Sequence, residues 1–159
     1  LMPLVNGTPL VMNAIPVDPR DLMRGDYVRL AYDMQTIEID SSIATDFQKE
    51  QRLRYGEVVY VTYQDNGDTV IATGVYTSMP TGKAFLRARS QRGVTIRRSS
   101  KSEWDRTVRL DYGIEEYYTD SETAKQIEKT IRDGKTIQVH CMVAEDGLMR
   151  IRALSTDAH

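Results

Sequence analysis

Hydrophobic and polar residues alternate along much of this chain, and short turn sequences interrupt the alternation at intervals typical of hairpins. The clearest run is residues 57–64, where Val, Tyr and Thr dominate, as they do in strands. The turn sequence Asp-Asn-Gly-Asp at 65–68 leads into a second such run, residues 69–79. Together these segments predict an antiparallel hairpin.

The same pattern predicts strands elsewhere. Residues 84–89 and 94–98 are expected to pair across a turn near Arg92-Gly93, and residues 136–143 and 148–154 across Glu145-Asp146-Gly147. Further strands are expected at residues 10–16, 107–110 and 115–118. In residues 27–33 one face should carry Val28, Leu30 and Tyr32, and the other Tyr27, Arg29 and Ala31.

One segment has helical spacing. Ala124, Ile127 and Ile131 form a narrow apolar stripe, Ser121 is a suitable N-cap, and Gly134 suits the end of a helix near 121–133. Residues 41–56 fit either a short helix capped by Ser42 or a loop. The expected fold class is mainly β (β-rich α+β), built of antiparallel hairpins with one helix, in a single domain over residues 1–159.

Composition narrows the function classes. The chain has 159 residues, is 40% hydrophobic and 28% charged, and carries a formal net charge of −2. A slightly acidic chain does not favour nucleic acid as a partner. The single cysteine, Cys141, excludes an internal disulfide, and the two histidines, His140 and His159, are too few for a structural zinc site. No metal and no cofactor are expected.

No catalytic motif is visible either. Arg24-Gly25-Asp26 at the start of a strand resembles the Gly-Asp strand of signal peptidases and their self-cleaving repressor relatives. The nucleophilic serine of those enzymes would fall at Val17 here, and Lys83 is the nearest strand lysine for a general base. A peptidase-like scaffold without its nucleophile therefore stays open. So does a hydrolase with a carboxylate pair, because such pairs have no local signature.

Residues 17–33 are the most distinctive segment. Gly25-Asp26-Tyr27, Leu30 and Tyr32 spell the motif for which the GDYXXLXY family is named, and the chain resembles that family. The resemblance continues at Tyr60-Val61, at Leu86-Arg87, through residues 112–118 and in the closing hairpin. At residues 119–122 the chain departs from the Gly-containing acidic stretch of many relatives.

The resemblance implies a setting rather than an activity. Members of this uncharacterised family look like bacterial proteins with an N-terminal hydrophobic segment and an exported domain. They tend to be encoded beside polytopic membrane proteins. A signal or anchor segment is therefore expected upstream of Leu1-Met2-Pro3. The implied location is extracytoplasmic, tethered to the inner membrane, with a polytopic membrane protein as partner.

Two sets of residues are candidates for an interaction surface. The motif set is expected either to fix turns and strand packing or to line a groove for a partner. It comprises Asp18, Arg20, Asp21, Arg24, Gly25, Asp26, Tyr27, Leu30, Tyr32, Tyr112, Gly113 and Glu115.

The second set lies in residues 83–109, which hold nine basic residues against two acidic ones and include Trp104. This basic patch comprises Arg87, Arg89, Arg92, Arg97, Arg98, Arg106 and Arg109. Its interpretations are a solvated edge protected against strand pairing, or a site for an anionic partner, namely a lipid head group, an envelope polymer or an acidic loop of a membrane protein.

The sequence thus favours a non-catalytic, exported binding or assembly module associated with an integral membrane partner. The alternatives are a hydrolase acting on a cell-envelope polymer and the peptidase-like scaffold.

Overall fold

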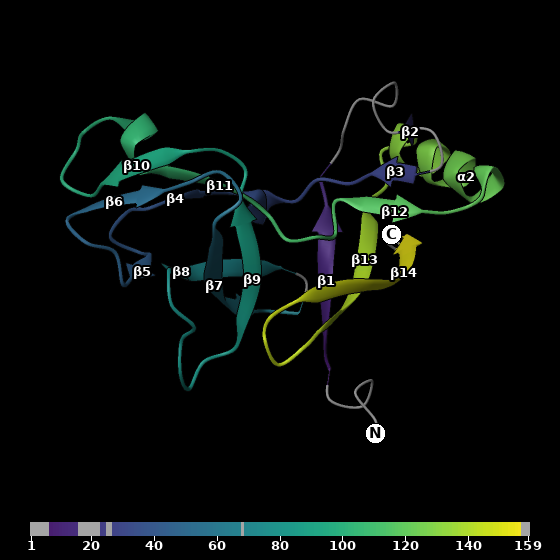
Figure 1. Cartoon of the computed structure of the whole chain (residues 1–159). Coiled ribbons are helices and arrows are strands. Elements are labelled where there is room, and N and C mark those ends of the chain that lie inside the picture. Colours follow the sequence, from purple (N-terminus) through teal and green to yellow (C-terminus); the bar gives the residue numbers. More distant parts are fainter. Residues whose placement is uncertain (1–6, 16–22, 25–26, 68, 157–159) are drawn as a thin grey trace.

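The computed structural model describes residues 7–15, 23–24 (backbone only), 27–67 and 69–156. Within these ranges most of the regular structure is β-strand, in sheets that are almost wholly antiparallel, with a single α-helix. The mainly β fold class is therefore confirmed. The described strands form two groups, which lie side by side in Figure 1.

The first group is built on a six-stranded sheet. In spatial order its strands are β4 (Thr36–Glu38), β11 (Thr107–Asp111), β9 (Phe85–Ser90), β7 (Val58–Asp65), β8 (Val70–Tyr76) and β5 (Ala44–Thr45). Neighbours are antiparallel except β5 and β8. A ribbon of β6 (Glu50–Leu53) and β10 (Val94–Arg97) lies beside it, next to the 3₁₀ turn η3 (Glu103–Arg106).

The second group contains two three-stranded sheets and the helix. One sheet has the order β1 (Thr8–Ala14), β13 (Ile137–Val143), β14 (Met149–Thr156). The other has the order β12 (Glu116–Tyr118), β3 (Tyr27–Arg29), β2 (Met23–Arg24). Helix α2 (Ser121–Arg132) packs against β13.

The two ends of α2 follow from the sequence. Asp120 accepts a hydrogen bond from the backbone N–H of Thr123 at 2.7 Å, which makes Asp120 the N-cap instead of the expected Ser121. An aspartate carboxylate here also complements the positive end of the helix dipole. Gly134 ends the helix with a φ of 79°, a conformation that glycine adopts without strain.

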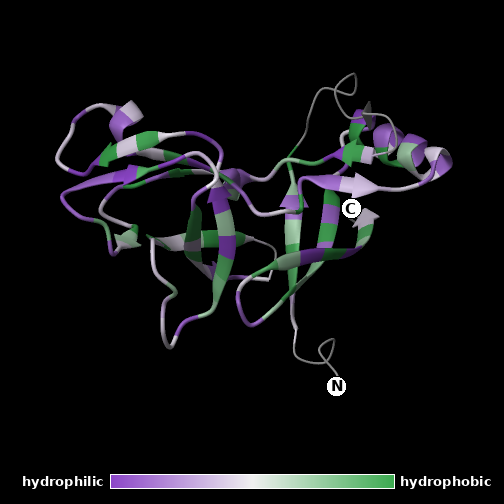
Figure 2. Ribbon diagram, in the orientation of Figure 1, coloured by the Kyte–Doolittle hydropathy of each residue, from purple (hydrophilic) through white to green (hydrophobic). Residues whose placement is uncertain are grey.

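Alternation along the strands places the core as the sequence predicts. Val59 and Val61 on β7, Leu86 on β9 and Val139 on β13 are completely buried. Figure 2 shows hydrophobic and hydrophilic residues alternating along these strands. Buried side chains from both groups belong to one hydrophobic cluster, and the segments that join the groups contribute to it with Leu30, Tyr112 and Ile114.

Two crossover segments connect the groups (Figure 1). Residues 30–35 lead from β3 to β4, with the 3₁₀ turn η2 (Asp33–Gln35) at their end, and residues 112–115 lead back from β11 to β12. The tip of the β13–β14 hairpin also reaches the first group. There the carbonyl of Gly147 accepts a hydrogen bond from the backbone N–H of Arg87 on β9 at 2.8 Å.

Several local predictions are confirmed. The β7–β8 and β13–β14 hairpins form as expected, as do strands at 107–111 and 116–118 and the helix near 121–133. The first strand runs from Thr8 to Ala14, two residues earlier than predicted. In residues 27–33 the side chains are alternately buried and more exposed, as predicted, although the strand itself ends at Arg29.

Two local predictions need correction. The predicted pairing of residues 84–89 with 94–98 is wrong, because β10 pairs with β6 and β9 lies between β7 and β11. The backbone N–H of Gln91 binds the carbonyl of Arg109 at 2.8 Å, which holds the chain after β9 against β11. For residues 41–56 the helix alternative is wrong, since the segment forms β5, β6 and connecting turns.

Candidate functional site

The motif residues that the structure describes join the two crossover segments. Leu30 and Tyr32 are buried on the first segment, and Tyr112 is buried on the second. The Tyr32 hydroxyl donates to the Ile114 carbonyl at 2.6 Å. The Tyr112 hydroxyl donates to the Met34 carbonyl, also at 2.6 Å. Each tyrosine thus satisfies a backbone carbonyl of the opposite segment, and we call this pair of bonds the tyrosine clasp.

Glu115 extends the clasp with both its backbone and its side chain. Its carbonyl accepts the N–H of Leu30 at 2.8 Å. Its two carboxylate oxygens accept the backbone N–H groups of Tyr112 and Gly113, each at 2.9 Å. Gly113 has a φ of 86°, so this carboxylate holds a turn that glycine makes possible.

Burial raises the pKa of Glu115, and the negative charge of Asp111 raises it further, while the two backbone N–H bonds oppose the rise. Burial also strongly raises the pKa values of Tyr32 and Tyr112, so their hydroxyls remain donors even at a pH where an exposed tyrosine ionises. For Tyr32, Tyr112 and Glu115 the contacts are therefore those of a structural support.

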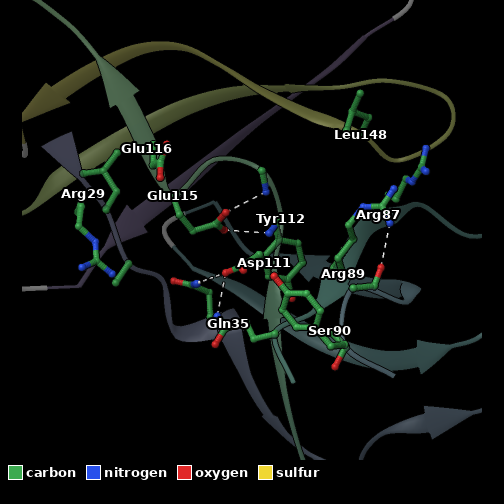
Figure 3. Close-up of a pocket in the computed structure, with 17 residues that line it drawn as sticks. Arg29, Gln35, Arg87, Arg89, Ser90, Asp111, Tyr112, Glu115, Glu116 and Leu148 are labelled. Atoms are coloured by element: carbon green, nitrogen blue, oxygen red, sulfur yellow. Dashed lines mark hydrogen bonds between the residues drawn. The ribbon is translucent and has the colours of Figure 1, made fainter. Parts of the chain in front are cut away.

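This support forms one wall of a cleft of about 980 Å³ between the two groups of strands, which Figure 3 shows in close-up. The cleft is lined by Arg29, Leu30, Ala31, Gln35, Tyr55, Gly56, Arg87, Ala88, Arg89, Ser90, Gln91, Asp111, Tyr112, Gly113, Glu115, Glu116 and Leu148. These residues come from β3, β9, β11, the start of β12, the two crossover segments and the turns at residues 55–56, 91 and 148. A cleft of this size is large enough for several residues of a polymeric ligand.

The middle of the cleft contains a fixed polar network. One carboxylate oxygen of Asp111, Oδ1, accepts the side-chain N–H of Gln91 at 2.8 Å and that of Gln35 at 3.2 Å. Gln91 also donates to the Leu110 carbonyl at 3.2 Å. The carboxylate is thus held in one orientation, and its second oxygen has no partner among the described residues.

One end of the cleft presents arginines beside exposed apolar side chains. Arg89 donates from Nη1 to the carbonyl of Gly56 at 2.9 Å. Arg87 lies 3.7 Å from Asp146, measured from Nη1 to Oδ2. Tyr55, next to Gly56, is 80% exposed, and Leu148 is 40% exposed. Figure 3 places Arg87, Arg89 and Leu148 together, with Arg29, Glu115 and Glu116 toward the other end.

The structure divides the basic patch that the sequence suggested. Only Arg87 and Arg89 line the cleft. The guanidinium of Arg92 lies 5.9 Å from the ring centre of Trp104. Arg97 pairs with Glu50 at 3.4 Å and with Asp105 at 3.5 Å, and Arg106 pairs with Glu38 at 3.6 Å. Arg98 and Arg109 donate to the hydroxyls of Thr45 and Thr36. Several of these charges are therefore compensated locally.

Part of the motif set falls outside the description. Asp18, Arg20, Asp21, Gly25 and Asp26 lie outside the described residues, and so does Val17. Arg24 is described by its backbone, which pairs with Tyr27. Tyr27 packs its ring against the exposed Tyr118, with ring centres 5.5 Å apart, and neither residue lines the cleft.

Several cleft residues were not among the sequence candidates, namely Arg29, Gln35, Tyr55, Gln91, Asp111, Glu116 and Leu148. Sequence offered a signal for three of them, since Arg29, Asp111 and Glu116 stand beside motif residues. Within the described part of the chain, no group of three or more His, Cys, Asp or Glu is placed to hold a metal ion. No helix of the described ranges is long and apolar enough to cross a membrane.

Comparisons with known proteins bear on this architecture. Neither the curated proteins nor the solved structures gave a significant match. A family model described as GDYXXLXY protein matches residues 2–154, nearly the whole chain. The match covers both crossover segments and every residue of the cleft. The chain therefore belongs to the GDYXXLXY family.

Proposed function

We propose that this protein is a non-catalytic binding module on the extracytoplasmic side of the membrane. In this proposal the cleft holds an extramembrane segment of an integral membrane partner. One observation carries it: the cleft between the strand groups presents two arginines on β9, an exposed tyrosine on a neighbouring turn and amides oriented by hydrogen bonds. Groups held in place before a ligand arrives lose little entropy on binding it.

The role of the motif in this proposal is to build the cleft. Tyr32, Tyr112 and Glu115 direct their polar atoms into bonds with the opposite crossover segment. Their polar groups are engaged there, while those of Arg89 and Asp111 face the cleft. Recognition is therefore assigned to the cleft side chains rather than to the described motif residues.

A second candidate is hydrolysis of a cell-envelope polymer. It is favoured by the presence of Asp111, Glu115 and Glu116 in one cleft and by the raised pKa of Glu115. Against it, both carboxylate oxygens of Glu115 already accept backbone N–H groups, which is the arrangement of a turn support. Asp111→Asn and Glu116→Gln test this candidate, since a hydrolase would lose activity on isolated envelope polymer while keeping its melting temperature.

The binding proposal is tested by photocrosslinking from the cleft. A benzoylphenylalanine replaces Tyr55 in the full-length protein in its native cells, and the matched control replaces Ile71, which is 51% exposed on β8 outside the cleft. We expect one membrane protein to be captured from position 55 and not from position 71. Equal capture from both positions, or none from position 55, would contradict the proposal.

The proposed location has its own test. Cys141 is buried, so the native protein offers no described thiol to a reagent in solution. Lys125→Cys on the outer face of α2 supplies an exposed one. We expect a membrane-impermeant maleimide to label this variant in intact cells whose outer layer is permeable to it. Labelling only after lysis would place the domain in the cytoplasm instead.

A further inference from the structure

Two arginines of the cleft project from one face of β9. Arg87 and Arg89 are two residues apart on a strand, so their side chains point to the same side, about 7 Å apart along the chain. Both line the cleft, and Figure 3 shows them close together beside Leu148. An extended polypeptide ligand repeats its own side chains with the same period.

Both guanidinium groups retain donors for a ligand. The bond from Arg89 to the Gly56 carbonyl uses one of five N–H groups and fixes the position of the others. Asp111, opposite Arg89 in the strand register, is held by Gln91 and Gln35 and makes no ion pair with Arg89. The Arg87–Asp146 pair is long at 3.7 Å, and its side chains are 34% and 49% exposed. Such an exposed pair is weak and can be exchanged for a better-placed carboxylate.

The neighbours of these arginines provide apolar contact area. Tyr55 is 80% exposed on the turn whose carbonyl Arg89 binds, and Leu148 is exposed at the hairpin tip whose neighbour Gly147 binds the Arg87 backbone. Tyrosine beside arginine is the composition typical of residues that dominate binding energy at protein interfaces. Both apolar side chains therefore gain burial if a ligand lies across the arginines.

We infer that this end of the cleft binds an extended polypeptide segment with acidic side chains at two alternate positions. The two carboxylates accept hydrogen bonds from Arg87 and Arg89, the apolar stems of the segment pack against Tyr55 and Leu148, and the residue between the carboxylates points away from β9. Glu116 lies toward the other end of the cleft and disfavours an acidic pair there. This inference rests on the proposed function, to which it adds the chemistry of the bound segment.

The test is selection of random decapeptides, displayed on phage, against the immobilised chain of residues 1–159. We expect enrichment of peptides with Asp or Glu at two positions separated by one residue. The double variant Arg87→Gln, Arg89→Gln should bind them about tenfold more weakly or worse, which corresponds to the loss of one good charge-assisted bond. The charge-matched control Arg52→Gln, Arg150→Gln, at two exposed positions outside the cleft, should bind them as the native protein does.

The outcomes separate the inference from the proposed function. Selected peptides that need Tyr55 but carry no acidic pair would overturn the inference and leave the binding module standing. Equal binding by the double variant and the native protein would overturn the inference as well. Titrations followed by backbone NMR at Arg89 also test binding of tetragalacturonate. If this acidic sugar binds the cleft and no peptide does, the inference and the proposed function are both wrong. Should the double variant not fold, Arg89→Lys replaces it. This substitution keeps the charge but removes the bidentate guanidinium, and it is expected to lower the affinity for acidic peptides without changing that for other peptides.

Discussion

At the scale of single residues, the tyrosine clasp shows how two short side-chain bonds can hold distant segments together. Tyr32 and Tyr112 are 80 positions apart in the chain, yet each hydroxyl reaches a carbonyl close to the other tyrosine. A carbonyl buried without a donor costs free energy, because it has lost its bond to water. The clasp therefore stabilises the crossover and also determines which backbone groups can be buried there.

Removing either hydroxyl of the clasp should destabilise the protein. Tyr32→Phe and Tyr112→Phe keep the ring and leave the carbonyl of Ile114 or Met34 without its donor, so each should lower the free energy of unfolding by about 1–3 kcal/mol. Tyr118→Phe is the matched control, because Tyr118 is 68% exposed and should change stability by less than about 0.5 kcal/mol. Urea denaturation of the three variants measures this. Equal, small effects in all three would show that water replaces the clasp.

The carboxylate of Glu115 should make stability depend on pH in a definite direction. Its folded pKa is raised by burial, so the folded state holds the proton more tightly than the unfolded state does. The stability that this group contributes is full below its usual pKa and is lost as pH rises through the raised value. Relative to Glu115→Gln, the native protein should therefore lose stability as pH rises above the usual glutamate pKa of 4.5.

Urea denaturation of both proteins at several pH values isolates this residue, since every other titrating group is shared. The opposite result would be a native protein whose stability increases relative to that of Glu115→Gln as pH rises. It would show that the hydrogen bonds from Tyr112 and Gly113 outweigh burial and that the folded pKa of Glu115 is lowered.

At the scale of elements, pairs adjacent in the chain could be predicted and distant pairs could not. The β7–β8 and β13–β14 hairpins carry turn sequences between alternating runs, so local sequence specifies them. The β10–β6 and β11–β9 pairs have no such signal, and their partners are selected by the rest of the fold. The cleft was not predictable for the same reason, because its lining comes from segments spread between Arg29 and Leu148.

The contact between the closing hairpin and β9 depends on one glycine. Gly147 has a φ of 86°, and a Cβ there would lie 2.7 Å from the backbone nitrogen of Arg87. Gly147→Ala combines an unfavourable backbone conformation, about 1–3 kcal/mol, with a collision against backbone that cannot move away cheaply. Gly134→Ala is the control, since Gly134 has a similar φ of 79° and open space around its Cβ position.

We expect Gly147→Ala to lower the melting temperature clearly more than Gly134→Ala does, in thermal unfolding followed by circular dichroism. If the two substitutions have the same effect, the hairpin tip can move away from β9, and the wall of the cleft beside Arg87 is adaptable.

At the scale of the whole molecule, the two groups of strands have separate sheets and a shared set of connections. The tyrosine clasp, the Glu115 turn and the Gly147 contact all cross between them, and buried side chains from both contribute to one hydrophobic cluster. Separate sheets alone would favour independent unfolding, whereas shared burial and shared buried hydrogen bonds favour a single cooperative transition. The shared contacts should dominate, because losing either group leaves the buried carbonyls of the crossover without their donors.

This balance predicts that both groups unfold together. In a urea titration followed by backbone NMR, the native signals of Val61 on β7 and Val139 on β13, both completely buried, should disappear with the same midpoint. Tyr112→Phe should lower both midpoints equally, because the clasp belongs to both groups. Two separate midpoints, or a shift confined to one group, would mean that the groups are energetically independent. In that case the cleft between them could change width on binding, and its lining would not be fixed before the ligand arrives.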